Sequence, residues 1–336
     1  MKPTEQLSEK ELCPEDLLAG QEAAFARDIE RLKAKRMEFI AVGCPACSSH
    51  DFRPTFEKFT FSYVTCVECE TLFMNPRPSP AIMASYYDNS ENYQYWAKHI
   101  FPTSEAARRE KIHRPWLERV IEYTERYRIS RGVLLEIGPG FGTFAQLARE
   151  SDAFGRVIAV ERTPEMVEAC RARGVEVIAK SIEEVKDQLT DVDVACAFEV
   201  IEHLFEPRTF LRAIARLIRP GGLLVLSCPN GKGFDILMLQ SQSLAIDPEH
   251  VNLFNPKSLG RLVNSCGFEV VEVTTPGRLD AEFVRTAILE GRYDVSNNPF
   301  LKRVLVDEWD QFGWPFQQFL AEQGLSSHMW LVVRKL

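Results

Sequence analysis

The 336-residue sequence lacks three features that would place it in a common class at once. It has no basic surplus, because 40 Lys and Arg stand against 48 Asp and Glu, for a formal net charge of -8. No overall positive field is then available to hold a phosphate backbone, which disfavours nucleic acid as a partner. It also has no apolar run near the roughly 18 residues that span a bilayer, and no basic-then-apolar start typical of export signals. We therefore expect a soluble, cytoplasmic protein.

Cysteine is also scarce, since nine residues are too few for a disulfide scaffold in a chain of this length. Five of the nine are scattered, and we interpret them as structural; these are Cys13, Cys170, Cys196, Cys228 and Cys266. The other four form two C-x-x-C pairs, Cys44 with Cys47 and Cys66 with Cys69, separated by 18 residues. This spacing is typical of a zinc site with four thiolate ligands at about 2.3 Å from the metal.

A closed shell of four sulfur ligands leaves no position for water, so we expect a structural zinc and no catalysis there. The metal would hold together a mini-domain that is too small to bury enough surface by itself. Iron in a rubredoxin-like site and four unliganded thiols remain as alternatives.

Composition predicts four regions along the chain. Residues 1–39 contain an N-terminal amphipathic helix, and residues 40–78 form the zinc-ribbon-like mini-domain, whose alternating aromatic residues favour short strands. Residues 79–130 form a helical linker or lid, with two helices separated by Pro102. From residue 131 to 336, apolar runs alternate with amphipathic helices, with a helical insertion at about 280–325. This alternation predicts an α/β, doubly wound, parallel sheet.

A glycine-rich turn follows the first strand of this predicted sheet, in the sequence LLEIGPGFG. Glu136, Gly138, Gly140 and Gly142 have the spacing E-x-G-x-G-x-G, and a helix begins at once. Such a turn lets a ligand lie against the backbone and offers it the free N–H groups of a helix N-terminus. A dinucleotide fingerprint would need glycine or alanine where Thr143 stands, which disfavours NAD.

The segment from about 130 to 275 resembles a class I S-adenosylmethionine-dependent methyltransferase. The resemblance implies a Rossmann-like, mostly parallel seven-stranded sheet with a small zinc-ribbon domain before it. It implies that Glu161 binds the ribose hydroxyls, with a helix-capping acid as the alternative, and that Ser181 stands where the family usually has an acid near adenine. The cofactor residues that it implies are Glu136, Gly138, Pro139, Gly140, Gly142, Glu161, Arg162, Ser181, Ile182 and Phe198.

The segment FEVIEHLFEP at 198–207 resembles a signature of O-methyltransferases in quinone biosynthesis. It places Phe198 and Glu199 at the carboxyl end of a strand, where open α/β sheets bind ligands. The same resemblance implies that Glu199, Glu202 and His203 bind a divalent cation, while His203 is also a candidate base or a structural histidine. His250 is a second candidate, for an acceptor pocket or for a plain loop. The catalytic candidates are therefore Glu199, His203 and His250.

The run from Cys66 to Tyr87 resembles bacterial methyltransferases that act on nucleotide-linked sugars and polysaccharide precursors. We therefore predict methyl transfer to a hydroxyl of a small molecule of this kind, in polysaccharide biosynthesis. C-methylation of a keto sugar, RNA methylation and a non-catalytic cofactor-binding module remain as alternatives. Tyr86, Tyr87, Tyr93 and Tyr95 form either a lid over a sugar or a packed helix surface. A surplus of basic residues between Lys98 and Arg131 either meets a diphosphate or lies on a solvated helix face.

Overall fold

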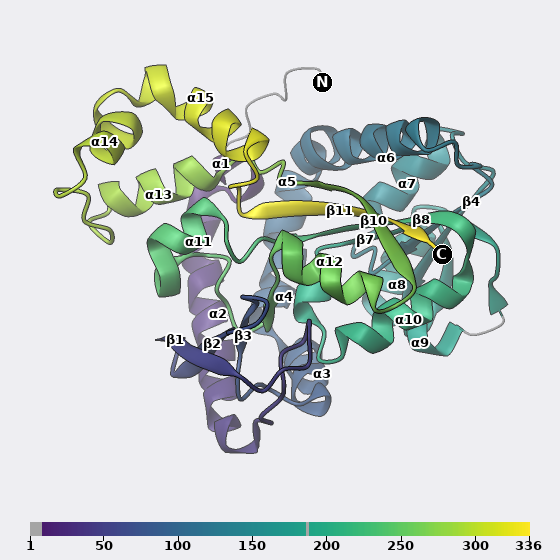
Figure 1. Cartoon of the computed structure of the whole chain (residues 1–336), viewed down its shortest axis with the longest axis horizontal. Coiled ribbons are helices and arrows are strands. Elements are labelled where there is room, and N and C mark those ends of the chain that lie inside the picture. Colours follow the sequence, from purple (N-terminus) through teal and green to yellow (C-terminus); the bar gives the residue numbers. More distant parts are fainter. Residues whose placement is uncertain (1–8, 186–187) are drawn as a thin grey trace. The chain divides into compact units, whose positions relative to one another are not determined.

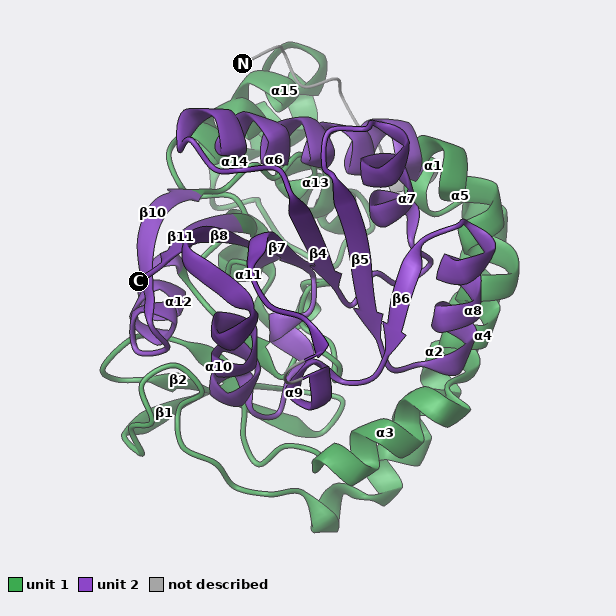
Figure 2. Ribbon diagram, turned by 90° about the vertical axis from the view of Figure 1, so that its right-hand side faces the viewer, with its two compact units in different colours: residues 1–107, 229–255, 274–329 green, residues 108–228, 256–273, 330–336 purple. Residues whose placement is uncertain are grey.

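The chain is described here from a computed structural model that covers residues 9–185 and 188–336. Internal contacts divide it into two units, which Figure 2 colours separately. Unit 1 comprises the residues up to 107 together with 229–255 and 274–329, and unit 2 comprises 108–228, 256–273 and 330–336. The predicted boundaries at residues 39, 78 and 130 follow composition, whereas the two units follow contacts, and the two divisions differ.

Unit 2 is built on a seven-stranded sheet with the strand order β10-β11-β8-β7-β4-β5-β6. The pairs β4–β5, β4–β7, β5–β6 and β7–β8 are parallel. The central strands β4 and β7 are buried nearly throughout, as expected for a parallel sheet that is covered on both faces. This confirms the predicted α/β, doubly wound, mostly parallel sheet. Its strands are β4 (Val133–Ile137), β5 (Arg156–Glu161), β6 (Glu176–Ala179), β7 (Val192–Phe198), β8 (Ile218–Pro229), β10 (Phe268–Thr274) and β11 (His328–Lys335).

Helices cover both faces of this sheet, with α6 and α7 on one side and α9 and α10 on the other (Figure 2). Alternate residues of β7, namely Val194, Cys196 and Phe198, pack into one apolar cluster with residues of α6 and α7. The helices of unit 2 are η3 (Arg109–His113), α6 (Arg114–Arg126), α7 (Thr143–Glu150), α8 (Pro164–Ala172), α9 (Ile182–Val185), η5 (Ile201–His203), α10 (Pro207–Leu217) and α12 (Pro256–Asn264).

Unit 1 contains a second sheet, antiparallel and four-stranded, with the order β1-β2-β3-β9. Its strands are β1 (Phe52–Lys58), β2 (Phe61–Cys66), β3 (Leu72–Met74) and β9 (Asn252–Leu253). The hairpin between β1 and β2 turns at Phe59 and Thr60, which both have positive φ, as in the two-residue turns that match strand twist. The short strands predicted from aromatic alternation are confirmed, and a distant segment adds the fourth strand.

The described part of unit 1 also contains helices (Figure 1). They are α1 (Glu9–Leu12), α2 (Glu15–Ala34), η1 (Arg36–Glu38), α3 (Pro80–Asn89), α4 (Glu91–Tyr95), η2 (Trp96–Ile100), α5 (Phe101–Arg108), α11 (Phe234–Leu239), η6 (Gln240–Gln242), α13 (Asp280–Leu289), α14 (Pro299–Lys302), η7 (Arg303–Asp307) and α15 (Trp309–Glu322). The predicted N-terminal helix and the predicted helical insertion are both present. One apolar cluster surrounds the four-stranded sheet, and another joins α11 to α13, α14, η7 and α15.

Pro102 does not separate two helices as predicted. It is the second residue of α5 and follows directly on the π-helical turn η2. Pro115 has the same place in α6, after the π-helical turn η3. Proline lacks an N–H group, so it is tolerated in the first turn of a helix and after a π-helical turn that interrupts the hydrogen-bond ladder.

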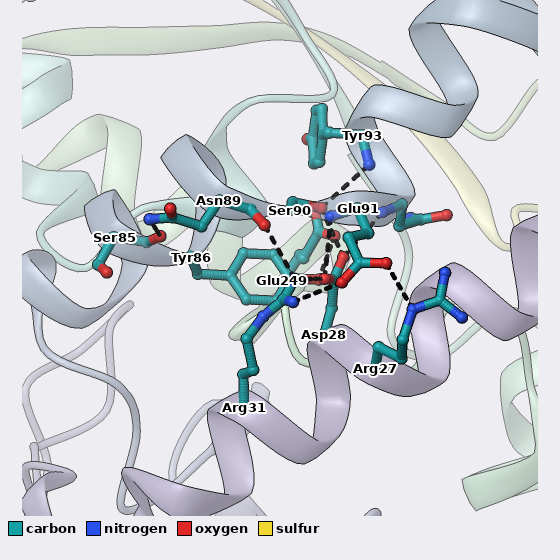
Figure 3. Close-up of polar contacts among 11 residues, drawn as sticks. Arg27, Asp28, Arg31, Ser85, Tyr86, Asn89, Ser90, Glu91, Tyr93 and Glu249 are labelled. Atoms are coloured by element: carbon teal, nitrogen blue, oxygen red, sulfur yellow. Dashed lines mark hydrogen bonds and ion pairs between the residues drawn. The ribbon is translucent and has the colours of Figure 1, made fainter.

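A buried aspartate joins two helices of unit 1 (Figure 3). Asp28 on α2 accepts hydrogen bonds from the Ser90 hydroxyl at 2.6 Å and from the Asn92 backbone N–H at 2.9 Å. It therefore caps the N-terminus of α4 from a different helix, and the positive end of that helix compensates its buried charge. In the described residues, no helix is long and apolar enough to cross a bilayer.

Candidate functional site

The sheet of unit 2 reverses its strand order at β4 and β7. These strands are neighbours although the chain forms β5 and β6 between them. Open α/β sheets bind ligands at the carboxyl ends of the strands beside such a reversal. The turn after β4 and the loop after β7 also touch, because a Cβ atom on Gly138 would lie 2.8 Å from Cγ2 of Val200. The predicted glycine turn and the predicted 198–207 segment therefore meet at the expected edge of the sheet.

The glycine turn has the backbone that its sequence predicts. Gly138, Gly140 and Gly142 all have positive φ, and the Gly142 N–H donates to the Pro139 carbonyl at 2.9 Å. Gly142 caps α7, where an added Cβ would lie 2.8 Å from the Cys170 sulfur atom, whereas a Cβ at Gly140 would meet nothing within 4 Å. The turn is thus packed against α8 at Gly142 and open at Gly140.

Glu136 is buried beneath this turn, with only 4% of its surface exposed. Its Oε2 atom makes no hydrogen bond. Burial raises the pKa of Glu136 to about 8, a backbone hydrogen bond from Ala145 opposes the rise, and repulsion from Glu161 adds to it. A buried carboxyl with an unsatisfied oxygen is costly by itself, so this position favours a ligand that brings a donor or a positive charge.

Glu161 ends β5 and turns back on its own loop. Its Oε1 atom accepts the N–H groups of Arg162 at 2.8 Å and Thr163 at 2.7 Å. Ser181 precedes α9, where its N–H donates to Glu184 at 3.0 Å, and the neighbouring Ile182 is buried. The structure thus holds Glu161, Arg162, Ser181 and Ile182 at the ends of β5 and β6, and their cofactor contacts stay predictions.

Phe198 and Glu199 have different surroundings. The Phe198 ring is 8% exposed and packs in the core, with its centroid 4.7 Å from that of Trp116 and 4.9 Å from that of Phe144. Its predicted contact with the cofactor stays a prediction. Glu199 has positive φ, and its Oε1 accepts the Ser227 hydroxyl at 2.6 Å. A non-glycine residue in this conformation marks a strained position, which is common at functional sites.

His203 lies on η5, just after this strained residue. Its Nε2 is 4.0 Å from Oε1 of Glu202, which is fully buried, while the histidine is 23% exposed. This contact is an ion pair only when the imidazole is protonated. The interpretations of His203 as a base, as a metal ligand or as a structural residue all stay predictions.

The four predicted metal-ligating cysteines come together in unit 1. All four sulfur atoms lie within 4.8 Å of one another, and the pairs Cys44–Cys69 and Cys47–Cys66 are both 3.5 Å apart. Donation from the Cys44 thiol lowers the pKa of Cys69 to about 4. Tetrahedral zinc with ligands at about 2.3 Å requires sulfur atoms about 3.8 Å apart, which is close to these distances.

The two C-x-x-C turns have matching backbone geometry. The Ser48 N–H donates to the Cys44 carbonyl at 2.8 Å, and the Glu70 N–H donates to the Cys66 carbonyl at 3.0 Å. Ser48 and Glu70 both have positive φ. Each turn therefore folds back after its second cysteine and aims both sulfur atoms at the same point.

His250 lies on the loop of unit 1 that precedes β9. Its Nδ1 is 3.0 Å from the Ala245 carbonyl and 3.3 Å from Oδ2 of Asp247. Because a carbonyl can only accept, Nδ1 carries the proton, and the lone pair of the neutral ring is then on Nε2. Next to it, the buried Glu249 accepts the Tyr86 hydroxyl at 2.9 Å (Figure 3). Burial raises the pKa of Glu249 to about 7, and Asp247 contributes to the rise.

Residues 107–273 match the family model described as a methyltransferase domain. This part of the chain is a class I S-adenosylmethionine-dependent methyltransferase domain. A protein of Mycolicibacterium smegmatis described as a probable S-adenosylmethionine-dependent methyltransferase is 32% identical over 139 residues, or 41% of this chain and 52% of that protein. A protein of the same description from Mycobacterium tuberculosis is 34% identical over 137 residues, covering 40% and 48%. The ubiquinone biosynthesis O-methyltransferase of Xanthomonas oryzae is 32% identical over 104 residues, covering 29% and 43%. The chain spans about half the length of the curated relatives it matches.

The sequence interpretation missed two acidic groups of the site. Asp247 and Glu249 are the acidic partners of His250 and Tyr86, and the only available signal was the three-residue spacing from Asp247 to His250, which suits a local turn. In the basic segment between Lys98 and Arg131, several arginines form ion pairs. Arg109 pairs with Glu150, Arg114 with Glu110, and Arg126 with Glu122 and Glu272. These ion pairs favour the solvated helix face over a diphosphate site.

Proposed function

We propose that the chain transfers a methyl group from S-adenosylmethionine to a hydroxyl of a small molecule, of the nucleotide-sugar or polysaccharide-precursor type. The observation that carries the proposal is the unsatisfied Oε2 atom of Glu136, buried beneath an open glycine turn at the strand reversal. It lies in the segment that matches the methyltransferase family.

The residues at this edge fit the cofactor. S-adenosylmethionine brings a cationic sulfonium, an ammonium and two ribose hydroxyls, and when bound it supplies a methyl group that is already activated. Glu136 offers a carboxylate to the positive charge, and the turn from Gly138 to Gly142 offers backbone against which the ligand can lie. One oxygen of Glu161 is held by backbone N–H groups, which fixes the direction in which its carboxylate faces the ribose.

Methylation of a hydroxyl also requires removal of a proton, to which a positioned base contributes about 100- to 10,000-fold. We propose His250 for this role, because Asp247 and the Ala245 carbonyl fix the tautomer whose Nε2 can accept a proton. His203 is the second candidate, because its Nε2 lies 4.0 Å from Oε1 of Glu202. The activated methyl group leaves the remaining work to positioning the acceptor and excluding water.

An acceptor rich in hydroxyl groups is supported by the polar groups around His250. The Tyr86 hydroxyl and the Glu249 carboxyl form a hydrogen-bonded pair, and both kinds of group bind sugar hydroxyls readily. The O-methyltransferase among the relatives supports oxygen as the methylated atom. Polysaccharide biosynthesis rests on the resemblance of residues 66–87 to enzymes of that class.

We further propose that Cys44, Cys47, Cys66 and Cys69 hold a structural zinc ion. The sulfur separations, the low pKa of Cys69 and the paired turns all suit a closed tetrahedral thiolate site. Metal analysis of purified protein should find one zinc per chain. One iron per chain would assign a rubredoxin-like site, and no metal would leave four free thiols.

Titration calorimetry with S-adenosylmethionine tests the cofactor site. Glu161→Gln should weaken binding at least tenfold, because it loses a charged acceptor for the ribose hydroxyls. The matched control is Glu165→Gln, which removes an exposed acid four residues further along and should leave the affinity unchanged. Equal affinities for the wild type and both variants would remove Glu161 from the site, and absence of binding to the wild type would overturn the proposed function.

Labelled methyl transfer to a panel of nucleotide sugars and glycan intermediates tests the acceptor. An O-methyl product supports the proposal, and a C-methyl product by NMR would assign keto-sugar chemistry instead. Transfer to RNA alone would overturn the small-molecule acceptor, and cofactor binding without any transfer would indicate a binding module. In the same assay, His250→Gln and His203→Gln identify the base, because unchanged turnover removes that histidine from the chemistry.

A further inference from the structure

We propose that the four-cysteine module positions the acceptor side of the site, so that metal at Cys44, Cys47, Cys66 and Cys69 fixes residues 243–255 and with them His250. This inference rests on the proposed role of His250 in methyl transfer. The contacts between the cysteine module and residues 243–255 that support it lie within unit 1. It assigns to the module a role in turnover in addition to its own folding.

Residues 243–255, hereafter the acceptor loop, have almost no regular structure of their own. They begin after the short turn η6 and contain only the two-residue strand β9. Even so, Val251, Leu253 and Phe254 are buried, as are Asn252 and Asn255. A buried segment without a helix or a long strand needs partners elsewhere for its backbone polar groups. Its conformation therefore depends on the element to which it is bound.

The C-terminal half of the acceptor loop is bound to the second cysteine turn. The Asn255 side-chain amide donates to the Cys69 carbonyl at 3.0 Å. Strand β9 pairs with β3, which begins three residues after Cys69, and the Met74 N–H donates to the Val251 carbonyl at 3.0 Å. The Thr71 hydroxyl also contacts the Cys69 sulfur atom at 3.1 Å. The backbone that presents Cys69 is thus the same backbone that holds β9.

The N-terminal half is bound to the hairpin that ends at Cys66. The Tyr63 hydroxyl, on β2, donates to the Asp247 carbonyl at 2.8 Å, and the Lys58 ammonium donates to the Ser243 carbonyl at 2.8 Å. Tyr63 is only 1% exposed, so water cannot easily replace the Asp247 carbonyl as the partner of its hydroxyl. Both halves of the acceptor loop are therefore held by strands that lie next to the cysteine turns in the sequence.

These contacts reach His250 through Asp247. One carboxylate oxygen of Asp247 accepts the N–H groups of Glu249 at 2.8 Å and His250 at 2.9 Å, while the other lies 3.3 Å from the His250 ring. Asp247 therefore fixes both the backbone and the ring of His250, and Tyr63 fixes Asp247 from the hairpin. The path from Cys66 to the candidate base consists of one strand, one hydroxyl and one carboxylate.

Tyr63→Phe tests this path, because it removes a single hydroxyl and leaves all four cysteines. Its matched control is Thr65→Val, which removes a hydroxyl from the same strand that bonds to Thr55 on the exposed side of the hairpin. Both variants should retain full metal content. We expect amide hydrogen exchange of residues 245–250 to rise at least tenfold in Tyr63→Phe and to stay unchanged in Thr65→Val.

The same variants separate positioning from general stability. Tyr63→Phe should lower kcat about tenfold without changing the affinity for S-adenosylmethionine, whereas Thr65→Val should change neither. Removing the metal from the wild-type protein with a chelator should raise exchange throughout 245–255 and leave residues 133–142 protected. Wild-type exchange at 245–250 in Tyr63→Phe would overturn the inference, even if chelation unfolded the whole chain. The exchange measurement needs no acceptor, so it stands whether or not the proposed reaction is observed.

Discussion

The two units of the chain are built in opposite ways. In unit 2, strands and helices follow one another along the sequence, and five strands from β4 to β8 form neighbouring parallel pairs. In unit 1, three separated segments combine, and side chains bind the acceptor loop to the cysteine module through Asn255, Tyr63 and Lys58. Backbone pairing and apolar burial thus specify unit 2, whereas long-range polar contacts hold the acceptor loop of unit 1 next to the cysteine module.

This contrast teaches that the two halves of the proposed reaction are subject to different physical constraints. The proposed cofactor site follows from the topology of a parallel sheet, which brings the glycine turn to the strand reversal. The acceptor loop has no such topological rule and is shaped by individual hydrogen bonds.

The largest effect is expected in the core of unit 2. Phe198→Ala should lower the free energy of unfolding by about 3–5 kcal/mol, because the ring is buried among Trp116, Phe144 and Trp330. Urea unfolding measures this, with Phe319→Ala in unit 1 as the control, since that ring is half exposed and should cost below about 1 kcal/mol. Unchanged stability together with a loss of cofactor affinity would instead place Phe198 in the proposed cofactor site.

The glycine turn should show the next largest effect. Gly142→Ala should cost about 2–4 kcal/mol, because it adds a clash with Cys170 to the unfavourable positive φ. Gly140 also has a positive φ, but an added Cβ would meet no neighbouring atom. Gly140→Ala should therefore lower the free energy of unfolding by only about 1–2 kcal/mol. Thermal or urea unfolding of the pair isolates the contact with Cys170. Equal losses would show that α8 does not constrain the turn.

Cofactor affinity should depend on pH through Glu136. Burial raises the pKa of this carboxyl to about 8, so the free protein holds a proton there that a cationic ligand must displace. The dissociation constant should therefore fall by up to about tenfold per pH unit from pH 6 to 8 and then level off. Calorimetry at several pH values measures this, and Glu136→Gln should remove the dependence. A flat profile in the wild-type protein would exclude Glu136 as the group that titrates.

The last prediction concerns the stability of unit 1, which should fall with rising pH, whereas the cofactor affinity should increase. Burial and repulsion from Asp280 raise the pKa of Asp235 from 3.8 to about 6. Between these values the folded protein keeps a proton that the unfolded chain has lost, so the free energy of unfolding should fall by about 3 kcal/mol as pH rises through the window. Asp235→Asn should lose this decline in urea unfolding curves, and the exposed Asp310→Asn should keep it. The same decline in both variants would assign it to another group.

Local patterns were sufficient to predict most of unit 2. Apolar runs gave the strands, and the spacing of Glu136, Gly138, Gly140 and Gly142 gave a turn that the structure places at the strand reversal. The core position of Phe198 was also readable, because it alternates with Val194 and Cys196, yet the motif resemblance directed it to the cofactor.

Unit 1 was predicted only where its signals are local. The C-x-x-C spacing and the aromatic alternation predicted the cysteine cluster and the hairpin. No sequence pattern predicted β9, because two residues are too few to show a period. Its partner β3 also lies far earlier in the sequence, before the glycine turn. The pairing of Asp247 with His250 is local, but the hydrogen bond from Tyr63 that holds Asp247 joins residues far apart in the sequence and was beyond local rules.

The pairing of β3 with β9 has a consequence during protein synthesis. Arg77 and Asn252, whose side chains meet beside this pair, are 175 positions apart, so a ribosome must translate all the intervening codons before the sheet can close. Until then a nascent chain carries an open strand edge, the kind of surface that invites pairing with other chains. We therefore expect β3 to gain its second neighbouring strand only after residue 253 has been synthesised.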